Sequence, residues 1–176
     1  MKKTHLSIHT VAYVGVMAAL YFALSFLSIK LGNMKLSVAG LPIVVSGLLL
    51  GPLAGFLTGL AGAFLEQLVT YGITATTILW VLPAALRGLI VGLYAKHRGF
   101  ELDAKRIFLV TLLSGLVLTA LNTLSMYLDS KILGYYSFAY VFGAMLPRIA
   151  ASIVTSILFS LILPPLVKLL RRHVRL

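Results

Sequence analysis

Long apolar runs, separated by short polar connections, follow one another along the whole chain. We place them at about 8–28, 36–50, 52–70, 77–95, 107–128 and 138–168. A helix needs roughly 20 apolar residues to cross a bilayer, whereas a transmembrane β-strand alternates apolar and polar positions over about 10 residues. Since only helices and closed barrels satisfy their backbone in lipid, these continuous runs predict six transmembrane helices.

Composition agrees with a membrane protein. The 176 residues are 60% hydrophobic and only 11% charged, with a mean hydropathy of +1.05, whereas soluble domains are about 25% charged. The chain has no cysteine, so a disulfide framework and a thiolate metal site are excluded. No linker or low-complexity tract divides the chain, and residues 1–176 are therefore expected to form a single all-α transmembrane domain.

The net charge of +11 could indicate a nucleic-acid partner, but its distribution indicates a membrane topology instead. The first apolar run is too long for a secretory signal, so we interpret it as a helix that starts in the cytoplasm. Three basic residues then face outward: Lys30, Lys35 and Lys131. Ten face the cytoplasm: Lys2, Lys3, Lys96, Arg98, Lys105, Arg106, Lys168, Arg171, Arg172 and Arg175. Both termini are therefore predicted to be cytoplasmic, in a bacterial cytoplasmic membrane. The basic C-terminal tail is expected to anchor at anionic lipid, with a dedicated partner site as the alternative.

Three ionisable residues fall inside the predicted helices: Glu66, Arg87 and Arg148. Such groups are costly in a bilayer and indicate function by default. We place both arginines near the membrane midplane, about ten residues from the outer ends of their helices. A surplus of positive charge suits a ligand with a carboxylate or phosphate, which arginine binds bidentately. In the alternative, Glu66 pairs one arginine and the other caps backbone carbonyls.

Polar and aromatic side chains gather at the predicted outer ends of the helices, as in a ligand pocket that opens outward. An interfacial aromatic belt is the alternative for any single aromatic residue. With the three ionisable residues above, the predicted ligand-binding set includes Thr76, Trp80, Asn122, Tyr127 and Tyr136.

Two stripes of small residues recur at a spacing of four. One contains Gly15, Ala19 and Ala23, and the other runs from Gly47 to Ala63 across the Gly51–Pro52 break. Such stripes let helices approach closely in lipid. For the second stripe we predict packing within the molecule. For the first, a docking face for a partner and internal packing both remain open.

Enzyme signatures are missing from the sequence. It contains no glycine-rich phosphate loop, no His-Glu-x-x-His motif, and only four acidic residues. We therefore expect no enzyme activity, no resident cofactor and no metal site. If the protein takes part in transport, the energy must come from another subunit.

In combination, several segments resemble the substrate-binding S component of energy-coupling factor (ECF) vitamin transporters. They are AALYFA (18–23), GLLLGPLAGFLTGLAGAFLEQL (47–68), LPAALRGLIVGLYAK (82–96), LNTLSMYLDSKILGYYSFAYVFGAMLPRI (121–149) and LILPPLVKLL (161–170). The resemblance covers almost the whole chain and implies a six-helix bundle that captures a vitamin or precursor from outside.

The resemblance also implies partners, namely a transmembrane coupling protein and two cytoplasmic ATPases. Ala19 and Ala23 would dock on the coupling protein, and Gly15 extends their face. The segments at about 29–37 and 71–77 would be gates, and the outer parts of helices four to six would line the pocket. The S component would topple in the membrane to release its cargo inward.

The tyrosine-rich segment before Arg148 resembles that of members assigned to pantothenate or hydroxymethylpyrimidine. Pantothenate is a monoanion and hydroxymethylpyrimidine is uncharged, so the two intramembrane arginines favour pantothenate. Folate and cobalamin remain alternatives.

A structural protein of a cell-wall assembly complex would be a different class, but it would need neither an outer polar cup nor midplane arginines. A stand-alone transporter is a third interpretation, and we detect no inverted repeat that supports it.

Overall fold

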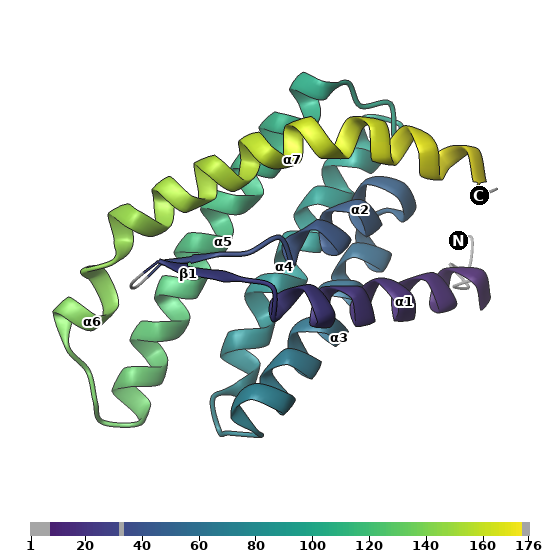
Figure 1. The fold of residues 1–176 in the computed structure, drawn as a ribbon. Coiled ribbons are helices and arrows are strands. Elements are labelled where there is room, and N and C mark those ends of the chain that lie inside the picture. Colours follow the sequence, from purple (N-terminus) through teal and green to yellow (C-terminus); the bar gives the residue numbers. More distant parts are fainter. Residues whose placement is uncertain (1–7, 32–33, 174–176) are drawn as a thin grey trace.

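The computed structural model describes residues 8–31 and 34–173 and is dominated by helices (Figure 1). Lys2, Lys3 and Arg175, which entered the orientation argument, lie outside the described residues, as do positions 32–33 of the first predicted gate. The helices are α1 (Ile8–Ser25), α2 (Gly40–Leu50), α3 (Pro52–Tyr71), α4 (Thr77–His97), α5 (Ala104–Ile132), α6 (Phe138–Phe142) and α7 (Met145–His173).

Five segments are long and apolar enough to cross a membrane, and α2 is a shorter apolar helix. The prediction of an all-helical membrane bundle is thus confirmed, with three differences in detail. The connection near 30–35 forms a small antiparallel hairpin of β1 (Ile29–Leu31) and β2 (Met34–Leu36). The fifth helix is longer than the predicted range of about 107–128 and includes Asp129. The sixth run divides into α6 and α7.

Local chemistry explains where several helices begin. The side chain of Asp103 caps α5 by accepting a hydrogen bond from the backbone N–H of Arg106 at 2.9 Å. At the start of α3, Gly51 has a φ of 89° and Pro52 occupies the first turn, where a missing N–H costs nothing. This pair turns the chain sharply between α2 and α3.

The glycine stripe of α3 packs inside the molecule, as the sequence predicted. A Cβ on Gly55 would collide with the backbone of Gly88 in α4, and a Cβ on Gly59 would collide with the backbone of Ala84. Ala63, at the end of the stripe, is also buried. The small residues therefore allow α3 and α4 to touch along their backbones.

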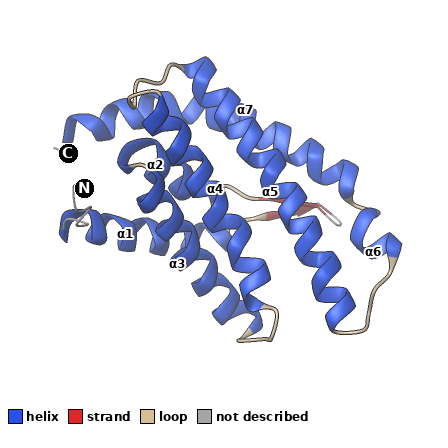
Figure 2. Cartoon of the chain, turned by 180° about the vertical axis from the view of Figure 1, so that it is seen from behind, coloured by secondary structure: helices blue, strands red, loops and turns tan. Residues whose placement is uncertain are grey.

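Helices α3 and α4 form one tightly packed pair, and α5 packs against α7 (Figure 1). The two described ends of the chain lie on the same side of the molecule, both in Figure 1 and in the view from behind (Figure 2). This agrees with termini on one side of the membrane, while their cytoplasmic location stays a prediction from the charges. Near these ends, the space between the helices is filled by a buried apolar cluster of α2, α4, α5 and α7.

Candidate ligand-binding site

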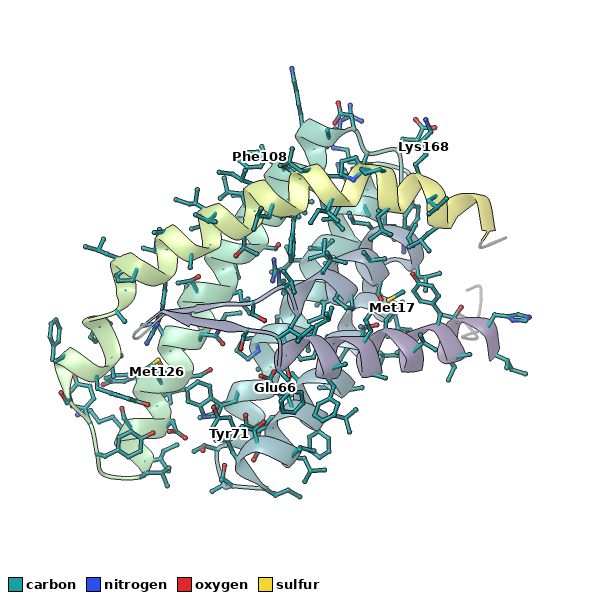
Figure 3. The ribbon with its side chains drawn as sticks, in the orientation of Figure 1. Met17, Glu66, Tyr71, Phe108, Met126 and Lys168 are labelled. Carbon is teal, nitrogen blue, oxygen red and sulfur yellow. The ribbon has the colours of Figure 1, made fainter. Side chains whose placement is uncertain are left out.

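A cavity of about 410 Å³ lies between the α3–α4 pair and the α5–α7 pair. This volume is within the usual range for small-molecule sites, roughly 300–1,000 Å³. Glu66 and Tyr71 of α3 lie on one side of the space, and Met126 of α5 lies on the other (Figure 3). The polar lining residues are Tyr21, Ser37, Glu66, Gln67, Tyr71, Trp80, Arg87, Thr119, Asn122, Arg148, Ser152 and Thr155.

Arg87 enters this cavity from α4 and is only 6% exposed. Its guanidinium lies over the ring of Phe159, 5.5 Å from the centroid, and its tip packs against Gly40 at the start of α2. Its Nε is buried and has no hydrogen-bond partner among the described residues. An unpartnered buried donor is unusual and requires an explanation, such as a missing ligand.

Arg148 lines the cavity from the opposite wall. The sequence analysis placed this residue about ten residues inside a helix. Because the sixth run divides, it lies instead in the first turn of α7. Its Nη1 is buried without a partner among the described groups, and so is the Oγ of Ser152, one turn farther along. Two walls of the cavity thus carry arginines with unused donors.

Glu66 lies on the α3 wall, where it accepts a hydrogen bond of 2.9 Å from the hydroxyl of Tyr21. Among the side chains that the structure describes, neither Arg87 nor Arg148 forms a salt bridge. The alternative in which Glu66 pairs one of the arginines is therefore not seen within this set. The described lining carries two guanidinium groups and one carboxylate.

The outer end of the site contains a second polar cluster around Asp129, which is only 5% exposed. The indole Nε1 of Trp80 donates to its carboxylate at 3.3 Å, and the hydroxyl of Tyr135 also donates to it. In the α5–α6 connection, the hydrogen bond to Asp129, with a smaller effect of burial, raises the pKa of the Tyr135 phenol above its usual value.

The structure brings together five of the eight predicted ligand-binding residues around the cavity: Glu66, Trp80, Arg87, Asn122 and Arg148. The other three do not line it, and their role in ligand binding stays a prediction. Thr76 is buried at the start of α4, and its hydroxyl lies 3.3 Å from the hydroxyl of Thr74. The rings of Tyr127 and Tyr136 meet edge to face, 5.6 Å apart, and Lys131 lies over both.

Helix geometry explains these differences. Asn122 and Met126 are four residues apart and share the cavity face of α5, whereas Tyr127 is rotated by about 100° from Met126. The same spacing could have identified Ser152 and Thr155, which lie four and seven residues after Arg148 and line the cavity. Tyr21 and Gln67 had no comparable signal in the sequence.

The small-residue stripe of α1 lies on the outside of the molecule. Gly15, Ala19 and Ala23 are exposed, and a Cβ on Gly15 would meet no atom within 4 Å. On the other face of the helix, Val14 and Ala18 are buried. Within the described part of the chain, the stripe therefore does not serve internal packing.

Curated relatives match part of the chain. UPF0397 proteins of Clostridium perfringens and Lactobacillus gasseri are 37% identical over 99 residues and 35% identical over 105 residues. The alignments cover 54% and 58% of this chain, and the chain spans about half the length of these relatives, 52% and 54%.

Two solved structures have a similar fold. A crystal structure of FolT bound with folic acid has a TM-score of 0.66 at 20% identity, and covers 87% of this chain and 90% of its own. The S component for biotin from an ECF-type ABC transporter has a TM-score of 0.65 at 18% identity, with 94% and 92% coverage.

The family model described as ECF-type riboflavin transporter, S component, matches residues 5–172. This match covers nearly the full length of the sequence, and it agrees with the bundle, the cavity and the five candidate membrane spans described above. The chain is a multi-pass membrane protein that belongs to the family of ECF-type riboflavin transporter S components.

Proposed function

We propose that this protein is the substrate-capturing subunit of an ECF-type importer that takes up a small anionic vitamin. It would bind the vitamin from outside and deliver it through a transmembrane coupling protein powered by two separate ATPases. One observation carries the anionic part of the proposal: Arg87 and Arg148 both line the cavity, and each has a buried donor without a partner among the described residues. The family and fold are those of transporter subunits and not of enzymes.

Electrostatics supports an anionic ligand. A buried guanidinium loses the hydration that would stabilise its charge, and among the described residues no salt bridge to Arg87 or Arg148 offsets this loss. A carboxylate or phosphate can accept from two nitrogens of one arginine at once, which satisfies the donors and neutralises the charge. A purely structural membrane protein would gain nothing from leaving these donors unused.

Pantothenate is our first candidate ligand. It is a monoanion, so its carboxylate can pair with an arginine. Its hydroxyls and amide match the neutral polar groups of the lining, such as Asn122, Ser152 and Thr155. Folate shares the carboxylate chemistry, whereas hydroxymethylpyrimidine does not. Cobalamin belongs in the same binding panel.

Riboflavin is the second candidate, because the matching family model is described by that vitamin. It is uncharged at neutral pH, so it would leave both guanidinium groups without an anion. Its flat ring system could instead pack on Trp80, and its hydroxyls could accept from the arginines. Measured preference between an anionic and a neutral vitamin therefore separates the two candidates.

Titration of the purified protein tests the proposal. We expect saturable binding of pantothenate, and a loss of about 2–4 kcal/mol in Arg87→Gln and Arg148→Gln, as for a lost charged partner. Arg98→Gln is the matched control, because Arg98 lies at the exposed end of α4, over Tyr94 and outside the cavity. The full panel contains pantothenate, folate, hydroxymethylpyrimidine, cobalamin and riboflavin, and the absence of binding to all five would refute the capture function. Unchanged affinity in both cavity variants, with lower thermal stability, would assign the arginines a structural role.

The outward stripe of α1 is the proposed docking face for the coupling protein. Gly15, Ala19 and Ala23 are exposed, and so are the larger apolar residues Val11 and Val16 on the same helix. Small residues at a spacing of four would allow a partner helix to approach the backbone closely. The segments at about 29–37 and 71–77 are proposed to gate access to the cavity.

A further inference from the structure

Asp129 is a buried carboxylate that does not line the cavity but contacts a residue that does. It is 5% exposed and lies in the last turns of α5. Two hydrogen-bond donors reach it from different parts of the chain: Trp80 from the first turn of α4 and Tyr135 from the α5–α6 connection. Among the described side chains, none forms a salt bridge with it.

Trp80 depends on this carboxylate for its orientation. Its indole lines the cavity, and the ring has a single donor, which points to Asp129 at 3.3 Å. A hydrogen bond to a charged acceptor is stronger than one to a neutral acceptor. Because the ring nitrogen is already used, Trp80 offers the cavity an apolar aromatic surface and no hydrogen-bond donor.

The backbone next to Trp80 is held by a separate contact. The hydroxyl of Ser125 donates to the carbonyl oxygen of Leu79 at 2.5 Å, and it thereby ties α5 to the first turn of α4. Removal of the Asp129 carboxylate should therefore release the indole ring while the helix stays in place. The two contacts can be separated by mutation.

We propose that Asp129 is a positioning residue for ligand recognition, which holds the Trp80 indole at the cavity wall so that its face packs on a planar or apolar part of the ligand. The ligand would thus combine an anionic end near the arginines with an apolar or planar end near Trp80. This inference rests on the proposed capture of a vitamin. It adds a residue outside the cavity that determines affinity through another side chain.

Trp80 is the only tryptophan of the sequence, so its fluorescence reports this site alone. In Asp129→Ala without ligand, we expect a shift of the emission maximum and stronger quenching by acrylamide, because the ring gains freedom. In the same variant, the affinity for pantothenate or riboflavin, whichever the wild type binds, should fall at least about fivefold. Asp129→Asn keeps an oxygen acceptor and should recover part of both changes.

Two controls separate positioning from a general loss of structure. Tyr135→Phe removes a different donor from the same carboxylate. It should leave the emission maximum unchanged and the ligand affinity within about twofold of wild type. Ser125→Ala breaks the neighbouring tie between α4 and α5, and should lower the melting temperature without shifting the emission. Trp80→Phe completes a double-mutant cycle, since the effect of Asp129→Ala on affinity should disappear when the indole N–H is absent.

Wild-type affinity and emission in a folded Asp129→Ala protein would overturn the inference and leave the capture function intact. If Asp129→Ala does not fold, Asp129→Leu, which keeps the branched shape and removes both acceptors, decides in the same way. An undiminished effect of Asp129 substitution in the Trp80→Phe background would also overturn it, because the carboxylate would then act by another route. If the wild type binds no vitamin, the capture function and the inference both fail.

Discussion

The substitution Gly40→Ala tests whether Arg87 meets the ligand, because it moves the guanidinium without removing its charge. Gly40 is the first residue of α2, and its missing side chain leaves room for the tip of Arg87. A Cβ at this position would overlap Nη1 and lie 3.3 Å from Cζ. Since non-bonded carbon contacts prefer about 3.5–4.0 Å, the guanidinium must retreat by roughly 1 Å.

The expected loss of affinity is smaller than for removal of the arginine. Truncating a buried charged partner costs about 2–5 kcal/mol, whereas a displaced guanidinium keeps its attraction and loses its alignment. We expect about 1–2 kcal/mol, or a fivefold to thirtyfold weaker affinity for an anionic ligand. Stability should change little, because a flexible side chain can yield and alanine is favoured over glycine in helices by up to about 1 kcal/mol.

Isothermal titration calorimetry with two ligands that differ only in their charged group measures how much the ligand carboxylate contributes to affinity. Pantothenate and pantothenol differ by a carboxylate in place of an alcohol, so Gly40→Ala should weaken the first and spare the second. Gly15→Ala is the control substitution, because a Cβ there meets nothing within 4 Å. Equal losses for both ligands, or no loss for pantothenate, would contradict the assignment of Arg87 to the anionic group.

Three further substitutions test other parts of the structure. Gly88→Ala should lower the melting temperature in detergent, with a cost of about 1–3 kcal/mol for overpacking, because its Cβ would collide with the backbone of Gly55; an unchanged melting temperature would contradict the close contact. Thr58→Val should leave the melting temperature unchanged or raise it, since the buried Thr58 hydroxyl has no partner among the described residues. A clear fall would show that the hydroxyl is bonded. Ala19→Leu should abolish co-purification with the coupling protein and spare vitamin binding, because Ala19 is exposed; loss of vitamin binding instead would place it in internal packing.

The length and continuity of the apolar runs were sufficient to predict the bundle, because the requirement for internal hydrogen bonding in lipid leaves few alternatives. The glycine stripe of α3 was also interpreted correctly, since the Gly51–Pro52 break argued against a continuous outer face. The intramembrane position of Arg87 and Arg148 identified two walls of the cavity, because charged groups in a membrane segment need a polar environment.

The differences between the predicted and the observed cavity lining concern side chains near the membrane surface. There, aromatic and polar residues occur for several reasons, and composition does not show which way a side chain points. Tyr127 and Tyr136 pack on each other and under Lys131, although they resemble pocket residues in the sequence. The fifth helix was predicted to end with its apolar run at about 128, whereas α5 continues past that run and includes Asp129. The contact of Asp129 with Trp80 could therefore not be foreseen.

The construction of the cavity separates stability from affinity. The α3–α4 wall is held by backbone contacts between small residues, as at Gly55 and Gly88, and neither of these two residues lines the cavity. The α5–α7 wall contacts the α3–α4 wall through the apolar cluster at one end of the molecule and through Ser125 and Asp129 at the other end. Changes in the glycine contact should therefore alter the melting temperature with little selectivity among ligands. Substitution of Asp129 itself should alter ligand affinity, because its contact between the two walls ends on a cavity residue, Trp80.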